Sequence, residues 1–355
     1  MRAILFLLVF LTAVLAGCTS SRPEAQLEDR VAIQLDDISP DGSTIAFRYR
    51  HKTIGNRIGL FDWRTGNLTT VPSPPGTSFY DSRFTADGKK LLTRAFVQGT
   101  NDLFLVDLAT LQATLLVQIS MDLLPGGLES IPVLEPQGDK VLFSTGLPVR
   151  RLIRLDVKTG ETTVLLGEYF KWAIFAPYVV GQNEIILSGM NPVDSEVIKR
   201  LESLGLHSVD APVYRLRFGG RPELVFPTER RANPLIDNVS ASGDGKTIAF
   251  IGLSMNAPYN ERKQYNLEIF TVTDGIVRQH TDLKMHMSHA KVSRDASAVV
   301  FAALSERAPR MWRGTQYEFD AEHFVVELRN NKVTQTKLRA TLQQRINDEL
   351  GLSTQ

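Results

Sequence analysis

Apolar and polar positions alternate over short stretches through most of the chain, and one kind of turn recurs between these stretches. The segment SPDGSTIAF at Ser39–Phe47 returns as SGDGKTIAF at Ser242–Phe250. Both copies place two polar residues and an Ile-Ala-Phe strand after a Ser-x-Asp-Gly turn. Glycine tolerates a positive φ angle and aspartate accepts hydrogen bonds within its own turn, so each copy predicts a tight hairpin. Six copies of decreasing fidelity occur, at Ser39–Phe47, Thr85–Thr93, Glu135–Phe143, Val179–Leu187, Ser242–Phe250 and Ser293–Phe301.

A second alternating element follows each copy of the turn. It consists of a strand, a polar turn such as Thr65-Gly66-Asn67, and another strand. The six elements lie at Ile58–Val71, Asp102–Val117, Arg151–Leu166, Pro212–Phe226, Leu267–Thr281 and His323–Leu338. With the short apolar run before each Ser-x-Asp-Gly turn, every unit therefore holds four strands.

Units of four strands that recur every 44 to 63 residues or so are typical of a β-propeller. A single unit cannot bury both of its faces, so neighbouring units must stack. We therefore expect an all-β fold, a six-bladed β-propeller of four-stranded antiparallel blades, over residues 31–338. A seven-bladed or irregular ring is the alternative.

Two segments have helical spacing instead. In the fourth unit, Asp194 is a candidate N-cap and Gly205 a candidate end, with Val197, Ile198, Leu201 and Leu204 between them. This helical insertion either covers an exposed part of the ring or contacts a partner. After the last unit, Leu338, Leu342, Ile346 and Leu350 form one stripe, which predicts a helix and tail at residues 339–355. We expect the stripe to pack against the last blade; docking a partner is the alternative.

The repeat resembles the WD40-like repeats of TolB-type periplasmic β-propellers. The resemblance rests on Ser-Pro-Asp-Gly, two polar residues, an apolar-Ala-Phe strand, and a strand ending in Asp before a Thr-Gly turn. It extends over about Val31–Leu338 and implies a module that binds other proteins. Proteins of the TolB type also carry an amino-terminal α/β domain, for which the residues before the first repeat leave no room.

The first residues, MRAILFLLVFLTAVLAGC, have a different composition. Arg2 precedes the apolar stretch Ala3–Val14, whose length suits a signal-peptide core better than a membrane span. The stretch ends in Leu15-Ala16-Gly17-Cys18, which resembles the lipobox of bacterial lipoproteins. The resemblance implies that residues 1–17 are a removed signal peptide and that Cys18 carries a diacylglycerol, with a further acyl chain such as palmitate on the new amino terminus. Residues 18–30 are then the lipidated cysteine and a tether.

The residue after the cysteine is Thr19 and not aspartate. By the usual enterobacterial sorting pattern, this implies a lipid-anchored protein of the bacterial cell envelope, at the outer membrane and facing the periplasm. The alternative is an ordinary cleaved signal with a chance cysteine. Cys18 is the only cysteine, so no internal disulfide is expected. Lipidation explains the presence of this single thiol.

Composition narrows the functional classes further. The 355 residues are 43% hydrophobic and 22% charged, as in soluble globular proteins, and the formal net charge is +1. There are no runs of lysine or arginine, so no nucleic-acid partner is expected.

Loop lengths indicate where a partner would bind. The turns between first and second strands are uniformly short, whereas those between second and third strands are long in the last three units. These long loops contain residue types that anchor protein–protein contacts. The candidate partner-binding residues are Arg310, Trp312, Arg313, Tyr317, Tyr259 and Tyr265. The alternative is that these rings pack back onto the blades.

Motifs for chemistry are sparse. The chain has no Gly-x-Ser-x-Gly, no glycine-rich phosphate loop and no His-Glu-x-x-His, and we expect no cofactor. His286 and His289 precede the sixth turn, and aligning the copies puts His289 level with Asp81, Asn238 and, roughly, Asp36. Such a set at a channel mouth could bind a divalent cation, as in oligogalacturonate lyases, which are also propellers. Three residues apart, however, the two histidines of a regular strand point to opposite faces, which makes them weak candidates.

The sequence thus predicts a non-enzymatic, lipid-anchored propeller that binds envelope proteins through its long-loop face. The alternative is a propeller that binds or cleaves a small polar or saccharide ligand in its central channel, with or without a metal.

Overall fold

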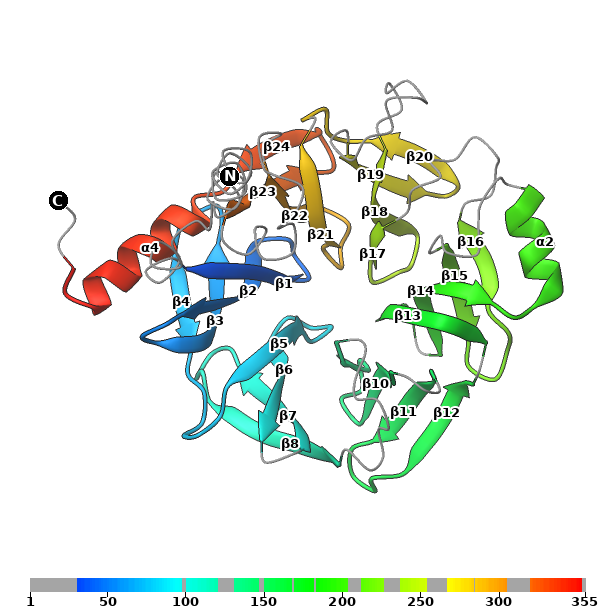
Figure 1. The fold of residues 1–355 in the computed structure, drawn as a ribbon, viewed down its shortest axis with the longest axis horizontal. Coiled ribbons are helices and arrows are strands. Elements are labelled where there is room, and N and C mark those ends of the chain that lie inside the picture. Colours follow the sequence, from blue (N-terminus) through cyan, green and yellow to red (C-terminus); the bar gives the residue numbers. More distant parts are fainter. Residues whose placement is uncertain are drawn as a thin grey trace, which may run out of the picture.

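The computed structural model describes residues 31–97, 100–120, 131–146, 150–167, 169–181, 183–203, 212–226, 237–253, 267–283, 285–304 and 320–352. Six four-stranded antiparallel sheets form a closed ring, which confirms the predicted six-bladed propeller (Figure 1). In each sheet, neighbours in space are also neighbours in the sequence, because every connection is a hairpin.

The blades follow one another around the ring. Blade 1 contains β1 (Ala32–Ile38), β2 (Thr44–His51), β3 (Gly55–Asp62) and β4 (Leu68–Val71), and blade 2 contains β5 (Phe79–Phe84), β6 (Lys90–Val97), β7 (Thr100–Asp107) and β8 (Ala113–Ser120). Blade 3 contains β9 (Val133–Leu134), β10 (Lys140–Ser144), β11 (Leu152–Asp156) and β12 (Thr162–Leu166). Blade 4 contains β13 (Phe170–Val179), β14 (Glu184–Pro192), β15 (Val213–Arg217) and β16 (Glu223–Phe226). Blade 5 contains β17 (Asp237–Ala241), β18 (Thr247–Leu253), β19 (Leu267–Thr273) and β20 (Ile276–Gln279), and blade 6 contains β21 (His286–Val292), β22 (Ala298–Leu304), β23 (Glu322–Glu327) and β24 (Lys332–Gln335).

The core is a ring of apolar clusters, one between each pair of adjacent blades. Successive residues of a middle strand face different clusters: Leu91 packs between blades 1 and 2, and Leu92 packs between blades 2 and 3. Alternate side chains of a middle strand point to opposite faces of its blade, and both faces are buried against neighbouring blades. Odd and even positions in these strands are therefore both apolar.

The repeated turn stabilises itself. In blade 1, Ser39 Oγ donates to Asp41 Oδ1 at 2.6 Å and accepts from the backbone N–H of Thr44 at 2.9 Å. Asp41 Oδ1 also accepts from the N–H of Ser43, and Gly42 has a φ of 70°. The same serine- or threonine-to-aspartate bond recurs in blades 2, 5 and 6. The repeat is therefore a structural turn whose polar groups satisfy one another.

The helical insertion of blade 4 is α2 (Ser195–Ser203). Asp194 caps it, because its Oδ1 accepts from the backbone N–H groups of Glu196 at 3.0 Å and Val197 at 3.3 Å. Leu201 is buried against Leu224 of β16. The contact supports the simpler of the two predicted roles, in which the helix covers its own blade.

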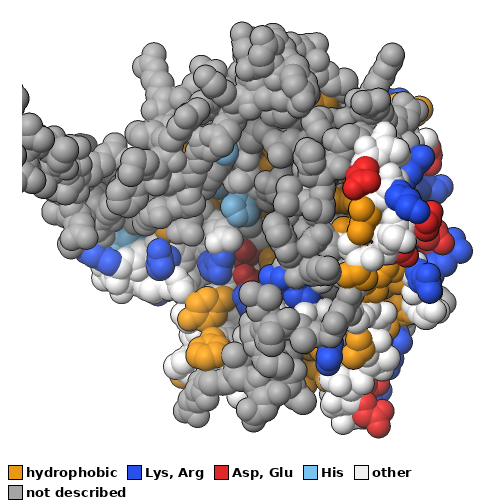
Figure 2. Space-filling model, turned by 45° about the vertical axis from the view of Figure 1, so that its right-hand side comes forward, with side chains coloured by type: hydrophobic (Ala, Val, Ile, Leu, Met, Phe, Trp, Pro, Cys, Tyr) orange, Lys and Arg blue, Asp and Glu red, His pale blue; other side chains and the backbone are white. Residues whose placement is uncertain are grey.

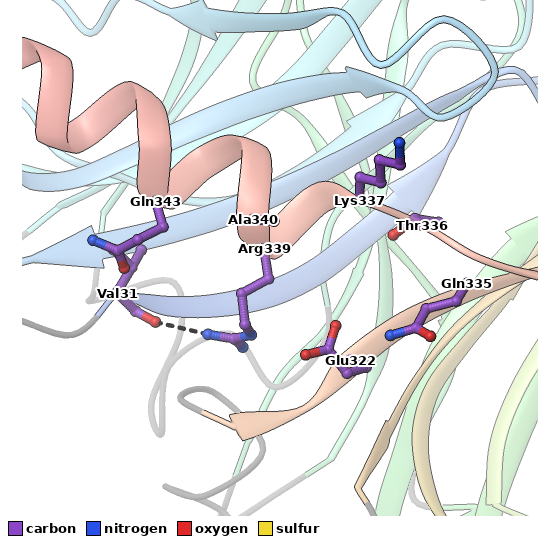
Figure 3. A pocket seen from close by; sticks show the side chains of 8 residues that line it. All are labelled: Val31, Glu322, Gln335, Thr336, Lys337, Arg339, Ala340 and Gln343. Atoms are coloured by element: carbon purple, nitrogen blue, oxygen red, sulfur yellow. Dashed lines mark hydrogen bonds between the residues drawn. The ribbon is translucent and has the colours of Figure 1, made fainter. Parts of the chain in front are cut away.

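The second helix, α4 (Leu338–Glu349), lies where the ring closes, beside blade 1 (Figure 1). Its buried residues Leu338, Leu342 and Ile346 belong to the cluster between blades 6 and 1, which confirms the predicted stripe and extends its contacts to the first blade. Arg339 donates to the carbonyl oxygen of Val31 at 3.2 Å (Figure 3). It also donates to the carbonyl oxygen of Ala321 at 3.1 Å, and so joins the two blades.

Closure involves no exchanged strand in the described part of the chain, because blades 1 and 6 are each built from four consecutive strands. Two further hydrogen bonds join the ends of the ring: the backbone N–H of Asp295 donates to the Pro40 carbonyl at 2.9 Å, and the guanidinium of Arg345 on α4 donates to the Leu68 carbonyl at 2.5 Å. None of the helices described is long and apolar enough to cross a membrane.

Candidate functional site

The innermost strands of five blades share an irregularity close to the channel. The pairing register shifts within β1, β5, β13, β17 and β21, shortly before the turn that leads to the second strand. Such β-bulges re-aim side chains that a regular strand would direct elsewhere. Asp36 lies within the bulge of β1, Asp81 borders that of β5 and His289 lies within that of β21, so the predicted polar level of the channel coincides with the bulges.

Asp81 is clamped by two arginines from different blades. Arg48 of β2 lies 3.5 Å away, and Arg94 of β6 forms an ion pair with the other carboxylate oxygen. Arg48 also donates to the side-chain oxygen of Gln34. Asp81 is 6% exposed, so these contacts act in a poorly solvated place and link blades 1 and 2.

Asp36 lies beside this clamp and is 1% exposed. Its Oδ2 accepts from Ser82 Oγ at 2.9 Å, while its Oδ1 is a buried oxygen that has no hydrogen-bond partner among the described residues. Burial raises the pKa of Asp36 to about 8, and Arg48 opposes this rise while Asp81 adds to it. The carboxyl group is therefore largely protonated at neutral pH.

A second polar group crosses the channel. Arg83 donates to the Pro177 carbonyl at 3.0 Å, and its guanidinium lies 4.7 Å from the centre of the Tyr178 ring. On blade 6, Lys291 donates to the Tyr178 hydroxyl at 3.2 Å. Tyr178 therefore sits between two cations that come from blades not adjacent to its own, with cation–π attraction on one side and a hydrogen bond on the other.

Asp37 of blade 1 lies close to Arg83 and Lys291 and is bonded to the backbone of blade 2. Its Oδ2 accepts from the N–H of Phe84 at 2.9 Å. Burial raises the pKa of Asp37, against the opposing effects of Arg83, the Phe84 N–H and Lys291. The carboxyl is thus held by its neighbours at a place where water does not solvate it well.

The two candidate histidines belong to β21, but the bulge between Ser288 and Lys291 interrupts the simple alternation that the sequence predicted for them. His289 has a positive φ of 58°, and its Nδ1 lies 2.7 Å from Ser288 Oγ. Burial, and then Lys291 and Arg48, lower the pKa of His289 to about 4, so the imidazole is neutral at pH 7. Among the described residues, no group of three or more His, Cys, Asp or Glu could hold a metal ion.

The remaining predicted sites lie outside the described residues. They are Cys18 and the six candidate contact residues Arg310, Trp312, Arg313, Tyr317, Tyr259 and Tyr265. The strands that flank the contact residues are described: β18 ends at Leu253 and β19 begins at Leu267, and β22 ends at Leu304 and β23 begins at Glu322. These connections join second to third strands, so they leave blades 5 and 6 on the face opposite the Ser-x-Asp-Gly turns.

A small pocket lies beside Arg48, at the junction of blades 1 and 2. It has a volume of about 160 Å³ and is lined by Ala32, Ile33, Gln34, Arg48, Arg50, Asn56 and Tyr80. We call it the rim pocket.

An oblique view of the molecule shows histidine, acidic and basic side chains close together near its middle (Figure 2).

A larger hollow of about 640 Å³ lies at the closure of the ring, between β24, the start of α4 and Val31. Its side chains are mostly polar, and Glu322 and Gln335 come from blade 6 while Arg339 and Gln343 come from α4 (Figure 3). Arg339 already bonds two carbonyl groups there, which gives this hollow a structural role in holding the first strand.

The arginines and the tyrosine of the channel were not predicted as site residues. A signal for some of them exists in the repeat, because Asp37, Arg83 and Lys291 each stand two positions before the start of their own copy of the turn, and Tyr178 stands directly before the fourth copy. Arg48 and Arg94 lie on second strands, where strand alternation gives no hint that they reach the channel.

No family model matches the chain, and no curated protein matches it either. Solved structures share its fold. TolB from Acinetobacter baumannii has a TM-score of 0.57 and 16% identity over 87% of this chain and 63% of that one. An oligogalacturonate lyase in complex with manganese has a TM-score of 0.52 and 19% identity over 86% of this chain and 78% of that one.

A putative TolB from Agrobacterium tumefaciens has a TM-score of 0.50 and 15% identity, over 86% of this chain and 88% of that one. The chain spans less than two thirds of the Acinetobacter TolB. At these identities the likeness is one of fold: the chain has a TolB-like six-bladed β-propeller fold, and proteins with that fold include both TolB and enzymes.

Proposed function

We propose that the protein is a non-enzymatic, lipid-anchored propeller of the bacterial envelope that binds another envelope protein through its long-loop face. The observation that carries the proposal is the difference between the two faces of the ring. The repeated turns on one face close on their own hydrogen bonds, whereas the long connections of blades 4, 5 and 6 leave from the other. Long loops on a rigid scaffold are where binding residues concentrate.

The polar channel supports the same reading. The carboxylate of Asp81 is engaged by two arginines, and Tyr178 is engaged by Arg83 and Lys291. The first group links the adjacent blades 1 and 2, and the second links blade 4 to blades 2 and 6, so a structural role accounts for much of the channel's polar character. Residue types that bind partners, by contrast, gather in the connections of blades 5 and 6, with Trp312 and Arg313 as the strongest candidates.

The anchor is the second part of the proposal. Cys18 ends a lipobox-like sequence after an apolar core, and several acyl chains on one residue hold a protein at a membrane far better than one chain does. A tether of a dozen residues or so then separates the lipid from the first strand, which begins at Ala32. In cells, Cys18→Ala should abolish incorporation of labelled palmitate and release the protein from the membrane fraction.

Partner binding can be tested with Trp312→Ala. The variant should lose the partner that the wild-type chain captures by crosslinking in intact cells, while its thermal unfolding stays unchanged. Arg64→Ala is the matched control, because Arg64 is an exposed residue of the β3–β4 turn on the opposite face, with its guanidinium 4.9 Å from the Trp63 ring. Identical captured proteins in Trp312→Ala and wild type would defeat the proposal.

One observation favours a second function, the binding or cleavage of a small polar or saccharide ligand in the channel. Asp36 Oδ1 and Arg83 Nη2 are buried and have no hydrogen-bond partner in the described ranges of the chain, and a ligand in the channel would satisfy such groups. A metal-assisted form of this function predicts stoichiometric metal in the purified protein. Elemental analysis that finds none would remove that form of the second function.

A further inference from the structure

The first strand begins on the long-loop face of the ring. β1 starts at Ala32, which pairs with Arg50 near the end of β2, and it ends at the Ser-x-Asp-Gly turn of blade 1. The N–H of Asp295, in the corresponding turn of blade 6, donates to the Pro40 carbonyl at 2.9 Å, so both turns lie on one face, here called the turn face. The chain therefore enters the ring on the opposite face, from which the β22–β23 connection also leaves.

The ring fixes this point of entry. Val31 is 3% exposed and belongs to the cluster between blades 6 and 1, and its carbonyl accepts from Arg339 at 3.2 Å. It lines the hollow at the ring closure together with Glu322, the first residue of β23, and Gln335, the last residue of β24 (Figure 3). Both of these strand ends belong to the long-loop face, because β23 and β24 are joined at the turn face. Any tether that precedes Val31 therefore starts from the long-loop face.

The tether is too short to pass freely around the ring. The dozen residues or so between Cys18 and Val31 span at most about 45 Å when fully extended and about 20 Å as a flexible coil. A path along the outside of a blade to the turn face would need about 26 Å for the length of β2 and about 14 Å for the width of four strands. This path would use nearly the whole extended tether and remove most of its conformational freedom. An anchor at Cys18 therefore favours the orientation in which the long-loop face is turned toward the membrane.

The same tether limits what fits between this face and the membrane. A coil of about 20 Å leaves less room than a small folded domain needs, because such a domain is about 30 Å across. A protein embedded in the membrane presents its surface at the headgroups, where the connections of blades 5 and 6 can contact it. Lipid itself is a poorer partner, because the net charge is +1 and there are no runs of lysine or arginine to attract anionic headgroups.

We propose that the long-loop face is turned toward the membrane that holds the lipid of Cys18, and that its partner is a protein embedded in this membrane. This orientation and this class of partner rest on the proposed function, which supplies the anchor and the binding face. The Ser-x-Asp-Gly turns are then directed away from the membrane.

Fluorescence energy transfer to a labelled lipid measures the orientation without any partner. Thr53→Cys and Thr65→Cys are a matched pair, because both threonines are exposed on blade 1 and lie at opposite ends of β3. Cys18 is the only natural cysteine and its sulfur is consumed by lipidation, so the introduced thiol alone takes up the donor dye. The full lipidated chain is reconstituted into vesicles of phosphatidylethanolamine and phosphatidylglycerol that carry an acceptor-labelled lipid. The Thr53→Cys protein should show about twofold higher transfer efficiency, since β3 separates the two positions by about 26 Å.

Photo-crosslinking in intact cells identifies the class of partner. p-Benzoylphenylalanine replaces Gln316 in the β22–β23 connection, and a protease site replaces residues 22–28 so that the tether keeps its length. After irradiation the tether is cut, which frees every ring that nothing else holds at the membrane. The Gln316 adduct should stay in the membrane through alkaline carbonate extraction, because its partner is embedded there. The same amino acid in place of Arg64, on the turn face, should give no retained adduct.

The two experiments can fail separately. Equal transfer from the two cysteines, or more from Thr65→Cys, would overturn the orientation. Release of the Gln316 adduct by carbonate, an adduct with phospholipid alone, or no adduct at all would overturn the embedded protein partner. Failure of the proposed function itself shows differently, as unchanged palmitate incorporation in Cys18→Ala or unchanged capture in Trp312→Ala.

Discussion

His323 is a fully buried histidine at the seam where the ring closes. It lies on β23, is 1% exposed, and neither ring nitrogen has a hydrogen-bond partner in the described part of the structure. Burial, followed by the charges of Arg339 and His289, lowers the pKa of His323 to about 3. The folded protein therefore holds this imidazole neutral over the whole range in which an unfolded histidine takes up a proton.

This difference makes stability depend on pH in a known direction. Below the ordinary histidine pKa of 6.5, the unfolded chain binds a proton that the folded chain does not, so acid favours unfolding until the pH approaches the folded value of about 3. Between pH 7.5 and pH 5 the linked protonation costs the folded state about 2 kcal/mol, because each pH unit below 6.5 contributes about 1.36 kcal/mol.

His323→Leu tests this reasoning, because leucine has a similar volume and cannot take up a proton. At pH 7.5 the variant should be at least as stable as the wild type, since it removes two buried nitrogens that have no partner among the residues described. From pH 7.5 to pH 5 it should lose about 2 kcal/mol less than the wild type. The free energy of unfolding is measured by urea titration followed by tryptophan fluorescence, with the slope m checked for constancy. Equal losses in the two proteins would refute a neutral, buried His323.

Two further predictions concern the channel and the strand packing. Asp36→Asn should be more stable than the wild type, by a margin that grows from pH 5 to pH 8 in urea titrations. The reason is that burial raises the folded-state pKa of Asp36 to about 8, so the wild-type protein loses stability as the pH rises toward that value. A margin that does not change with pH would contradict the buried, protonated carboxyl. Gly59→Ala should destabilise the fold by about 1–3 kcal/mol, because the new Cβ would lie 2.2 Å from a ring carbon of Phe47. Gly167→Ala is its control, since no atom of the described residues lies within 4 Å of a Cβ there. Similar midpoints for both variants in thermal unfolding would argue against the tight packing of Gly59.

Much of the fold could be predicted because its main signals are local. The turn at Ser39–Thr44 closes through bonds between residues two to five positions apart, so its chemistry can be recognised in a short stretch of sequence. The fourth copy lacks the serine and the aspartate, yet it still forms a turn, with the Val180 N–H bonded to the Glu184 carbonyl. Helix α2 was predictable for the same reason, because its cap and apolar spacing lie within one segment.

The channel could be predicted only in part. Aligning the copies placed Asp36, Asp81 and His289 at one level, and the structure locates all three at or beside bulges of inner strands. Strand alternation alone does not determine how the two histidines are oriented, because the bulge between Ser288 and Lys291 adds a residue to the strand. The charge on Asp36 also depends on burial, which a sequence pattern does not report.

The sequence by itself determined the repeat, the number of strands in each blade and the face on which the short turns lie, because these follow from hydrogen bonds and alternation within a few residues. Only the tertiary structure decided which polar groups meet. Arg83 reaches the Pro177 carbonyl 94 positions away, and Lys291 reaches Tyr178 113 positions away. It also decided that α4 closes the ring, through a bond from Arg339 to a carbonyl 308 positions earlier. Contacts of this length depend on how six blades pack around one axis, which each blade's own sequence does not encode.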